Sequence, residues 1–160
     1  MFDFALDPNV TKPALYAALE QSAAALVEGE RDPVANMANL AALIWMSVPR
    51  LNWAGFYRVD EGELVLGPFI GKPACIRIPF GQGVCGTAAA NGATQLVRDV
   101  HAFPGHIACD ADSRSELVVP VIVEGQVRAV IDLDSPELAR FDHEDAAGLE
   151  RVATIASRFL

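Results

Sequence analysis

Apolar residues recur every three or four positions at the start of the chain, a spacing that predicts amphipathic helices. Thr11 followed by Pro13 is typical of a helix N-terminus, and Leu15, Leu19 and Leu26 share one face of the helix that follows. We therefore expect a first helix that buries this face against the rest of the chain.

A second helix is predicted directly afterwards. Asp32-Pro33 gives the same start signal, and Pro49 ends the pattern. Between them the apolar residues form one stripe, which begins at Val34 and includes Met37 and Ile44. The chain thus opens with two helices.

The middle of the chain predicts strands, because its apolar residues come in short runs separated by turn residues. The first two runs are joined around Asp60-Glu61-Gly62, which is typical of a hairpin. The predicted strands are residues 53–59, residues 63–69, a short segment with Ile76 and Ile78, residues 94–97, residues 117–123 and residues 127–133.

Two further helices complete the pattern. Gly81-Gln82-Gly83 leads into a short Ala-rich helix over residues 84–90, and Phe141-Asp142 opens a C-terminal helix. Strands joined by hairpins, with helices at both ends of the chain, predict an α+β fold. We expect an antiparallel sheet with the N- and C-terminal helices packed on one face. No linker interrupts the pattern, so residues 1–160 are expected to form a single domain.

Composition narrows the possible partners. Hydrophobic residues make up 52% of the chain and the net charge is −9, with eleven of the 21 acidic residues between Asp110 and Glu150. Such a surface repels nucleic acid phosphates and anionic membranes. No apolar run reaches the roughly 18 residues that span a bilayer, and the N-terminus lacks a signal-peptide pattern. We therefore expect a cytoplasmic protein that binds neither nucleic acid nor membrane.

A long connection without periodicity lies between two predicted strands. It runs from Arg98 to Ser115, 18 residues in all. Inside a compact domain such a connection usually forms a functional loop or lid. Its chemically active or conformationally special residues are His101, Pro104, Gly105, His106, Cys109, Asp110 and Asp112.

Acidic residues gather on the last two predicted strands. Ile131 and Leu133 should face the helices, which places Asp132 and Asp134 together on the opposite face. If the turn comprises residues 124–126, Val123 opposes Val127 and Glu116 opposes Asp134. A two-residue turn would send Glu116 to the other face. Three clustered carboxylates repel one another and favour a cation, either an ammonium group or a metal ion, although a solvated sheet face is the alternative.

The three cysteines are Cys75, Cys85 and Cys109, with no CxxC pair. Their scattered positions are consistent with small buried side chains or with reactive thiols. Cys85 begins the short helix, where backbone dipoles favour a thiolate, and Cys109 lies on the long connection.

Two other kinds of site, a metal site and a phosphate loop, have only incomplete motifs in the sequence. His101, His106 and Cys109 are spaced by five and three residues, which matches no common zinc motif, so we expect no metal. Residues 81–86 are glycine-rich but lack the Gly-Lys-Ser/Thr ending of a phosphate loop, although the helix start could bind a ligand carboxylate.

Trp53 and Tyr57 share one strand face, either as core residues or as an apolar wall for a ligand methyl group.

Several segments closely resemble the free methionine-(R)-sulfoxide reductases, a branch of the GAF domain superfamily. The resemblance covers nearly the whole chain, and the three cysteines have family-like spacings of ten and twenty-four residues. The segments are Leu51–Tyr57, Gly67–Phe69, Gly81–Gly86, Arg114–Pro120 and Ile131–Pro136.

The resemblance implies a six-stranded antiparallel GAF sheet and an enzyme that reduces free methionine sulfoxide. Cys109 would attack the sulfoxide sulfur and become a sulfenic acid, and Cys75 would resolve it as a disulfide. Cys85 stays a candidate for either role. The implied partners are a thioredoxin-like reductant and a second copy of the chain, with no cofactor. A non-catalytic GAF sensor of small molecules or oxidants is the alternative.

The resemblance also assigns the substrate-binding residues. Trp53 and Tyr57 match the family's pocket wall, and Glu116, Asp132 and Asp134 match its acidic cluster. A free amino acid carries an ammonium group that a peptide residue lacks, so buried carboxylates would discriminate between the two. One acid, Asp134 or Glu116, would be protonated and would donate its proton to the sulfoxide oxygen.

Overall fold

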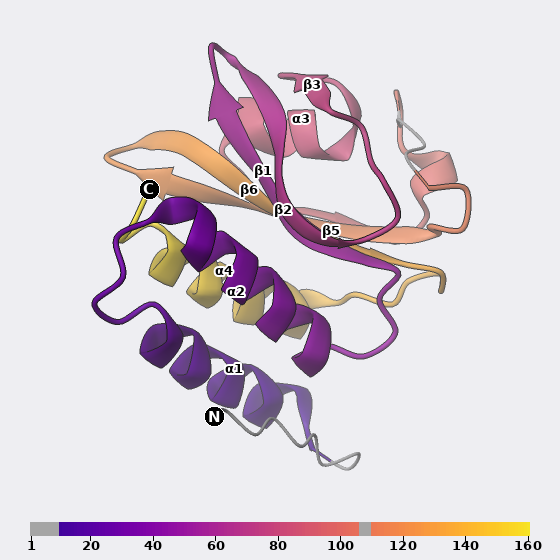
Figure 1. The fold of residues 1–160 in the computed structure, drawn as a ribbon. Coiled ribbons are helices and arrows are strands. Elements are labelled where there is room, and N and C mark those ends of the chain that lie inside the picture. The colour runs from indigo at the N-terminus through magenta and orange to yellow at the C-terminus, as the bar shows by residue number, and fades with distance from the viewer. Residues whose placement is uncertain (1–9, 106–109) are drawn as a thin grey trace.

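The computed structural model describes residues 10–105 and 110–160, which form a six-stranded antiparallel sheet covered by helices on both faces (Figure 1). The order of elements is the predicted one, with a 3-10 turn added in the long connection. The elements are α1 (Lys12–Leu26), α2 (Pro33–Ser47), β1 (Trp53–Asp60), β2 (Glu63–Gly71), β3 (Arg77–Pro79), α3 (Gly83–Asn91), β4 (Gln95–Val97), η1 (Val100–Ala102), β5 (Ser115–Val123), β6 (Gln126–Ser135) and α4 (His143–Ala156).

The strand order in the sheet is β3-β2-β1-β6-β5-β4, and each neighbouring pair is antiparallel. The predicted α+β class is therefore confirmed. Because β6 lies beside β1, the two central strands of the sheet are the first and the last strands in the sequence. None of the described helices is long and apolar enough to span a membrane.

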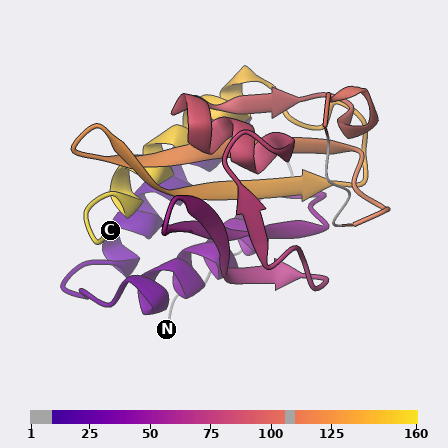
Figure 2. The ribbon, with the colours of Figure 1, turned by 90° about the horizontal axis from the view of Figure 1, so that it is seen from above.

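Helices α1, α2 and α4 cover one face of the sheet, as predicted, and α3 lies on the other face (Figures 1 and 2). The first core lies between the three helices and the inward residues of the central strands, among them Phe56, Ile131 and Leu133. The second core lies under α3 and includes Tyr57, Val118 and Val130. Because side chains alternate between the two faces along each strand, one face of the sheet forms the core under α1, α2 and α4, and the other face lines a pocket under α3.

The buried stripe of α1 differs from the predicted one. Tyr16, Leu19 and Ala23 are buried, whereas Leu15 and Leu26 are only partly buried at its margins. The reason lies in α4: Gly148 leaves the space that the Tyr16 ring fills, since a Cβ there would lie 2.1 Å from Tyr16 Cγ. Tyr16 is therefore the residue that α1 presents to α4.

Two smaller expectations are also corrected. Val34 is 51% exposed, because the buried stripe of α2 begins at Asn36 and Met37 instead. Ile76 lies just before β3 and is 71% exposed, although its carbonyl accepts a hydrogen bond from Leu66 N. Ile78 is inside β3 and buried, as predicted.

The turn between β5 and β6 has two residues, Glu124 and Gly125, both with positive φ, which is the shorter of the two turn lengths that the sequence left open. Val123 therefore pairs with Gln126. A bulge then shifts the register, because Ile122 pairs with Val127 but Val121 pairs with Ala129. The extra residue compensates for the short turn.

Candidate active site

A pocket opens on the α3 side of the sheet. Its opening to solvent included, it holds about 540 Å³ of space free of atoms. It is lined by Trp53, Tyr57, Lys72, Pro73, Ala74, Ile78, Gln82, Gly83, Val84, Cys85, Asp110, Ser113, Glu116, Asp132 and Asp134.

The floor of the pocket follows from strand register. Trp53 of β1 pairs with Asp134 of β6, which pairs with Glu116 of β5, so these side chains form one row across the sheet. Asp132 lies in the next row, between Gly55 and Val118. The predicted opposition of Glu116 and Asp134 is thus present, and the three carboxylates share one face.

Stacked aromatic rings form a wall beside this row. Trp53 stacks on Tyr57, with centroids 5.9 Å apart, and on Phe69 at 5.2 Å. Gly55 makes the stack possible, because a Cβ at that position would lie 2.7 Å from Trp53 Cη2 and 2.4 Å from Phe69 Cβ. Trp53 Nε1 donates to Lys72 O at 3.1 Å, and the Tyr57 hydroxyl donates to Cys75 O at 3.0 Å. The polar atoms of both rings are therefore satisfied within the protein, and both residues line the pocket.

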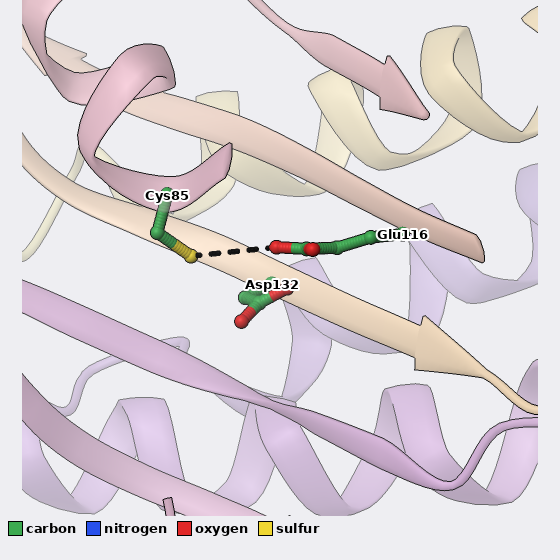
Figure 3. Close-up of side chains that lie close together, drawn as sticks. All are labelled: Cys85, Glu116 and Asp132. Atoms are coloured by element: carbon green, nitrogen blue, oxygen red, sulfur yellow. Dashed lines mark hydrogen bonds between the residues drawn. The ribbon is translucent and has the colours of Figure 1, made fainter. Parts of the chain in front are cut away.

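Cys85, Glu116 and Asp132 converge from α3, β5 and β6 (Figure 3). The Cys85 Sγ lies 3.9 Å from Glu116 Oε1, and one potential ligand atom from each residue lies within 4.8 Å of the other two. All three side chains are buried, and Asp132 Oδ1 has no hydrogen-bond partner in the described part of the chain. Among the described residues, no cationic side chain forms an ion pair with this cluster of polar groups.

Burial changes the acidity of these groups. It raises the pKa of Asp132 to about 7. Burial and the neighbouring carboxylate of Asp132 raise the pKa values of Glu116 and Asp134 well above the usual range. In the absence of a cation, protons are therefore retained in this cluster near neutral pH.

The expectation for Cys85 has to be corrected. Its position in the first turn of α3 predicts a stabilised thiolate, but burial, followed by the charges of Asp132 and Glu116, raises the pKa of this thiol well above its usual value. Desolvation and nearby negative charge outweigh the helix dipole. Cys85 is a free thiol with 4% exposure.

The end of the long connection is held over the pocket by polar contacts. Asn52 Nδ2 donates to Asp110 Oδ2 at 3.2 Å and to Ser113 Oγ at 3.0 Å. Lys72 forms ion pairs with Asp110 and Asp112. The backbone N–H of Asp112, followed by Lys72, lowers the pKa of Asp110, which is therefore ionised.

The structure covers only part of the predicted thiol site. Cys75, half-buried, is disulfide-bonded. Cys109 and His106 lie outside the described residues, so the pairing of Cys75 with Cys109 stays a prediction. His101 lies in η1 with its Nδ1 3.2 Å from Asp99 Oδ1.

Sequence patterns did not reveal Asn52, Lys72 and Ser113 as site residues. Asn52 had a signal, because it directly precedes the strand that carries Trp53. Lys72 had none, since its contacts to Asp110 and Asp112 span 38 and 40 residues of sequence. Lys72 is also the only cationic side chain among the described residues that line the pocket.

A pocket with an acidic floor and an aromatic wall fits a small ligand that has a cationic group and an apolar group. The GAF domain family model matches residues 35–160. The chain is therefore a GAF-domain protein. The extent of this domain over residues 1–160 stays a prediction.

Individual relatives narrow the family. The free methionine-R-sulfoxide reductase of Escherichia coli is 46% identical over 94% of this chain and 92% of its own length. The enzyme of that name from Saccharomyces cerevisiae is 44% identical over 94% of this chain and 88% of its own. The structure of the Neisseria meningitidis enzyme in complex with its substrate has a TM-score of 0.92 and 46% identity, covering 99% of this chain and 93% of that one. This chain belongs to the free methionine-(R)-sulfoxide reductase family.

Proposed function

We propose that this chain reduces free methionine-(R)-sulfoxide to methionine and that cysteine thiols supply the electrons. The observation that carries the proposal is the pocket, in which three clustered carboxylates lie beside stacked aromatic rings. Membership of the reductase family supports the same substrate.

The substrate fits the pocket by its charge and shape. Its ammonium group would lie against Glu116, Asp132 and Asp134, and it could donate to Asp132 Oδ1, which has no hydrogen-bond partner among the described residues. Its S-methyl group would lie against the faces of Trp53 and Tyr57. Binding of the ammonium group would lower the pKa values of the carboxylates, since an opposite charge favours their ionised form.

The reaction needs two thiols. The Cys109 thiolate attacks the sulfoxide sulfur, the S–O bond breaks, and the oxygen is transferred to Cys109 as a sulfenic acid while methionine is released. A carboxylic acid, Glu116 or Asp134, protonates the oxygen as it departs. The Cys75 thiol then attacks the sulfenic sulfur and releases water, which leaves a disulfide for an external dithiol to reduce.

Cys85 fits the attacking role poorly. Its thiol is buried under α3 and its pKa is raised, whereas an attacking cysteine needs a thiolate within reach of the substrate. The burial and the raised pKa of Cys85 argue against it as the nucleophile, and this supports the proposal that Cys109 attacks and Cys75 resolves.

The test is turnover of free methionine sulfoxide with a dithiol reductant. We expect rapid consumption by the native chain, none by Cys109→Ser, and about one equivalent of methionine from Cys75→Ser before it stalls. Rapid-quench measurement of methionine per protein distinguishes these cases. Failure of the native chain to turn over would favour the GAF sensor instead, and an active Cys109→Ser beside an inactive Cys85→Ser would reassign the nucleophile.

A thioredoxin-like protein as the external reductant, a homodimer and a cytoplasmic location stay predictions. The first is testable by replacing the small dithiol with thioredoxin and its reductase in the turnover assay.

A further inference from the structure

The cluster under α3 contains one residue that the proposed reaction does not use. Cys85 contributes a sulfur atom to a group whose other members are the carboxylates of Glu116 and Asp132 (Figure 3). The three side chains are 4%, 6% and 6% exposed. A buried sulfur between two buried carboxylates is an unusual environment, because the three groups are negatively charged when ionised, repel one another and supply no positive charge.

Two observations indicate that this cluster can accept a cation. Asp132 Oδ1 is buried and lacks a hydrogen-bond partner in the described ranges, although a buried carboxylate oxygen normally has one. Lys72, the one cationic side chain among the described residues of the lining, is directed instead to Asp110 and Asp112. The cluster thus has one carboxylate oxygen without a hydrogen-bond partner and, within the part of the chain that the structure describes, no cationic side chain paired with it.

We propose that Cys85, Glu116 and Asp132 form a binding site for a thiophilic divalent cation of the Zn²⁺ class, and that the bound ion excludes substrate from the pocket. One sulfur and two carboxylate oxygens form a three-ligand set, with a fourth position open toward the pocket. Mg²⁺ and Ca²⁺ fit poorly, since they prefer six or more oxygen ligands and none of sulfur.

The distances are compatible with such an ion. Ligands of a tetrahedral zinc ion lie about 3.5 Å apart when one is sulfur and the other oxygen. The Cys85 Sγ is already 3.9 Å from Glu116 Oε1, and no two of the three atoms exceed 4.8 Å. Side-chain rotations that move each atom by about 1 Å would complete the set, with no change in the backbone of α3, β5 or β6.

The exclusion of substrate follows from shared ligands. Glu116 and Asp132 are also the carboxylates proposed to hold the substrate ammonium group, and this part of the argument rests on the proposed function. Metal binding itself does not depend on it. Metal binding by the cluster and exclusion of the substrate by the bound ion can therefore be tested separately.

The experiment uses the oxidised, disulfide-bonded chain, in which Cys75 is not a thiol and Cys85 is free. Cd²⁺ is titrated into it without substrate, and the thiolate-to-cadmium band in the ultraviolet is recorded. We expect one Cd²⁺ per chain with release of protons, no signal with Mg²⁺, and loss of the band with at least about 100-fold weaker binding in Cys85→Ser.

Further variants separate the cluster from the rest of the pocket. Glu116→Gln and Asp132→Asn should keep the band but need higher Cd²⁺ concentrations, and Asp110→Asn, an acid of the same pocket outside the cluster, should behave as the native chain. An unaltered band in Cys85→Ser, or no binding by the native chain at millimolar Cd²⁺, would overturn the proposal. If Cd²⁺ binds through Cys85 but methionine sulfoxide does not displace it, the site stands and the ammonium placement is wrong.

Discussion

At the scale of single residues, the main feature of the pocket is a group of carboxylates that are buried from water. Asp132 is the centre of this arrangement, because it lies one row from Glu116 and Asp134 and its Oδ1 has no hydrogen-bond partner among the described residues. We therefore expect the pocket to be selective, because a ligand without a positive charge would gain no compensation for the buried carboxylates.

Blocking the substrate ammonium group should therefore weaken catalysis. N-acetyl-methionine sulfoxide should have a kcat/KM at least about 30-fold below that of the free amino acid, since an unmatched buried charge pair costs on the order of 2–5 kcal/mol. Asp132→Asn should reduce this discrimination, because it lowers both the attraction for the cation and the cost of a neutral ligand. Steady-state kinetics on both substrates decide the point, and equal rates would contradict the ammonium site.

Gly55 is predicted to be intolerant of even one added carbon. In Gly55→Ala the new Cβ would meet Phe69 and Trp53 at 2.4 and 2.7 Å, so the aromatic stack must open. Overpacking of this kind costs about 1–3 kcal/mol, and the displaced wall should raise KM more than it lowers kcat. Urea unfolding and steady-state kinetics measure the two effects.

Gly62→Ala provides the control for that variant. No atom lies within 4 Å of a Cβ at Gly62, and only its φ of +86° opposes the change. It should lose a little stability and keep the native KM. A KM for Gly55→Ala equal to the native value would show that the stack does not shape the binding site.

At the scale of elements, α1 and α4 are joined by a buried ionic cluster on the face away from the pocket. Asp145 of α4 accepts from the Tyr16 hydroxyl at 2.9 Å and from Arg140 Nη1 at 3.2 Å, and it pairs with Lys12. The side chains of Arg140 and Asp145 are 2% and 1% exposed, so each needs the other.

Removal of one partner should be costly. Asp145→Ala leaves the Arg140 guanidinium buried without its carboxylate, and we expect a loss of about 3–5 kcal/mol in the free energy of unfolding. Lys12→Met removes a partly exposed partner and should cost less than about 1 kcal/mol. Denaturant unfolding of both variants gives the comparison. Losses of similar size would mean that burial does not set the strength of this cluster.

The β5–β6 hairpin shows how far sequence alone reaches at this scale. Alternation correctly put Asp132 and Asp134 on one face, because the period of a strand is fixed by its backbone. The sequence left the turn length open, and a two-residue turn was expected to place Glu116 on the other face. Glu116 nevertheless opposes Asp134, because a bulge near Val121 restores the register. Positive φ at Glu124 and Gly125 favours the short turn, but nothing in the local pattern marks the bulge.

Contacts that depend on tertiary environment were beyond sequence reasoning in the same way. Tyr16 replaces Leu15 on the buried face of α1 because of the space above Gly148 in α4, 132 residues away. The helix position of Cys85 predicts a thiolate, yet the acids that reverse this effect come from two strands on the other side of the pocket. Local sequence signals identify helices and strands, whereas the pKa of a side chain such as Cys85 is determined by the charged residues that the folded sheet places next to it.

At the scale of the whole molecule, the sheet separates stability from function. Three helices pack one face into an apolar core, and the other face carries the acidic pocket. Burial of Glu116, Asp132 and Asp134 without a cation destabilises the ligand-free fold, and the helical face must offset this cost. The free energy of unfolding should consequently depend on pH through the ionisation of these carboxylates.

Ligand-free, chelator-treated protein should lose stability as the pH rises from about 5 to about 7.5. Burial raises the pKa of Asp132 from 3.8 to about 7, so within this range the folded state binds more protons than the unfolded state, and the free energy of unfolding falls with increasing pH. Asp132 alone should contribute about 2–3 kcal/mol, and Glu116 and Asp134 act in the same direction. Asp142, whose pKa Lys12 lowers to about 2, titrates below this range. Urea unfolding at the two pH values should show a smaller fall in Asp132→Asn than in the native chain. Because a bound ammonium group would offset the repulsion, methionine sulfoxide should stabilise the protein more at the higher pH. A native chain that is equally stable at both values would mean that the cluster is already compensated.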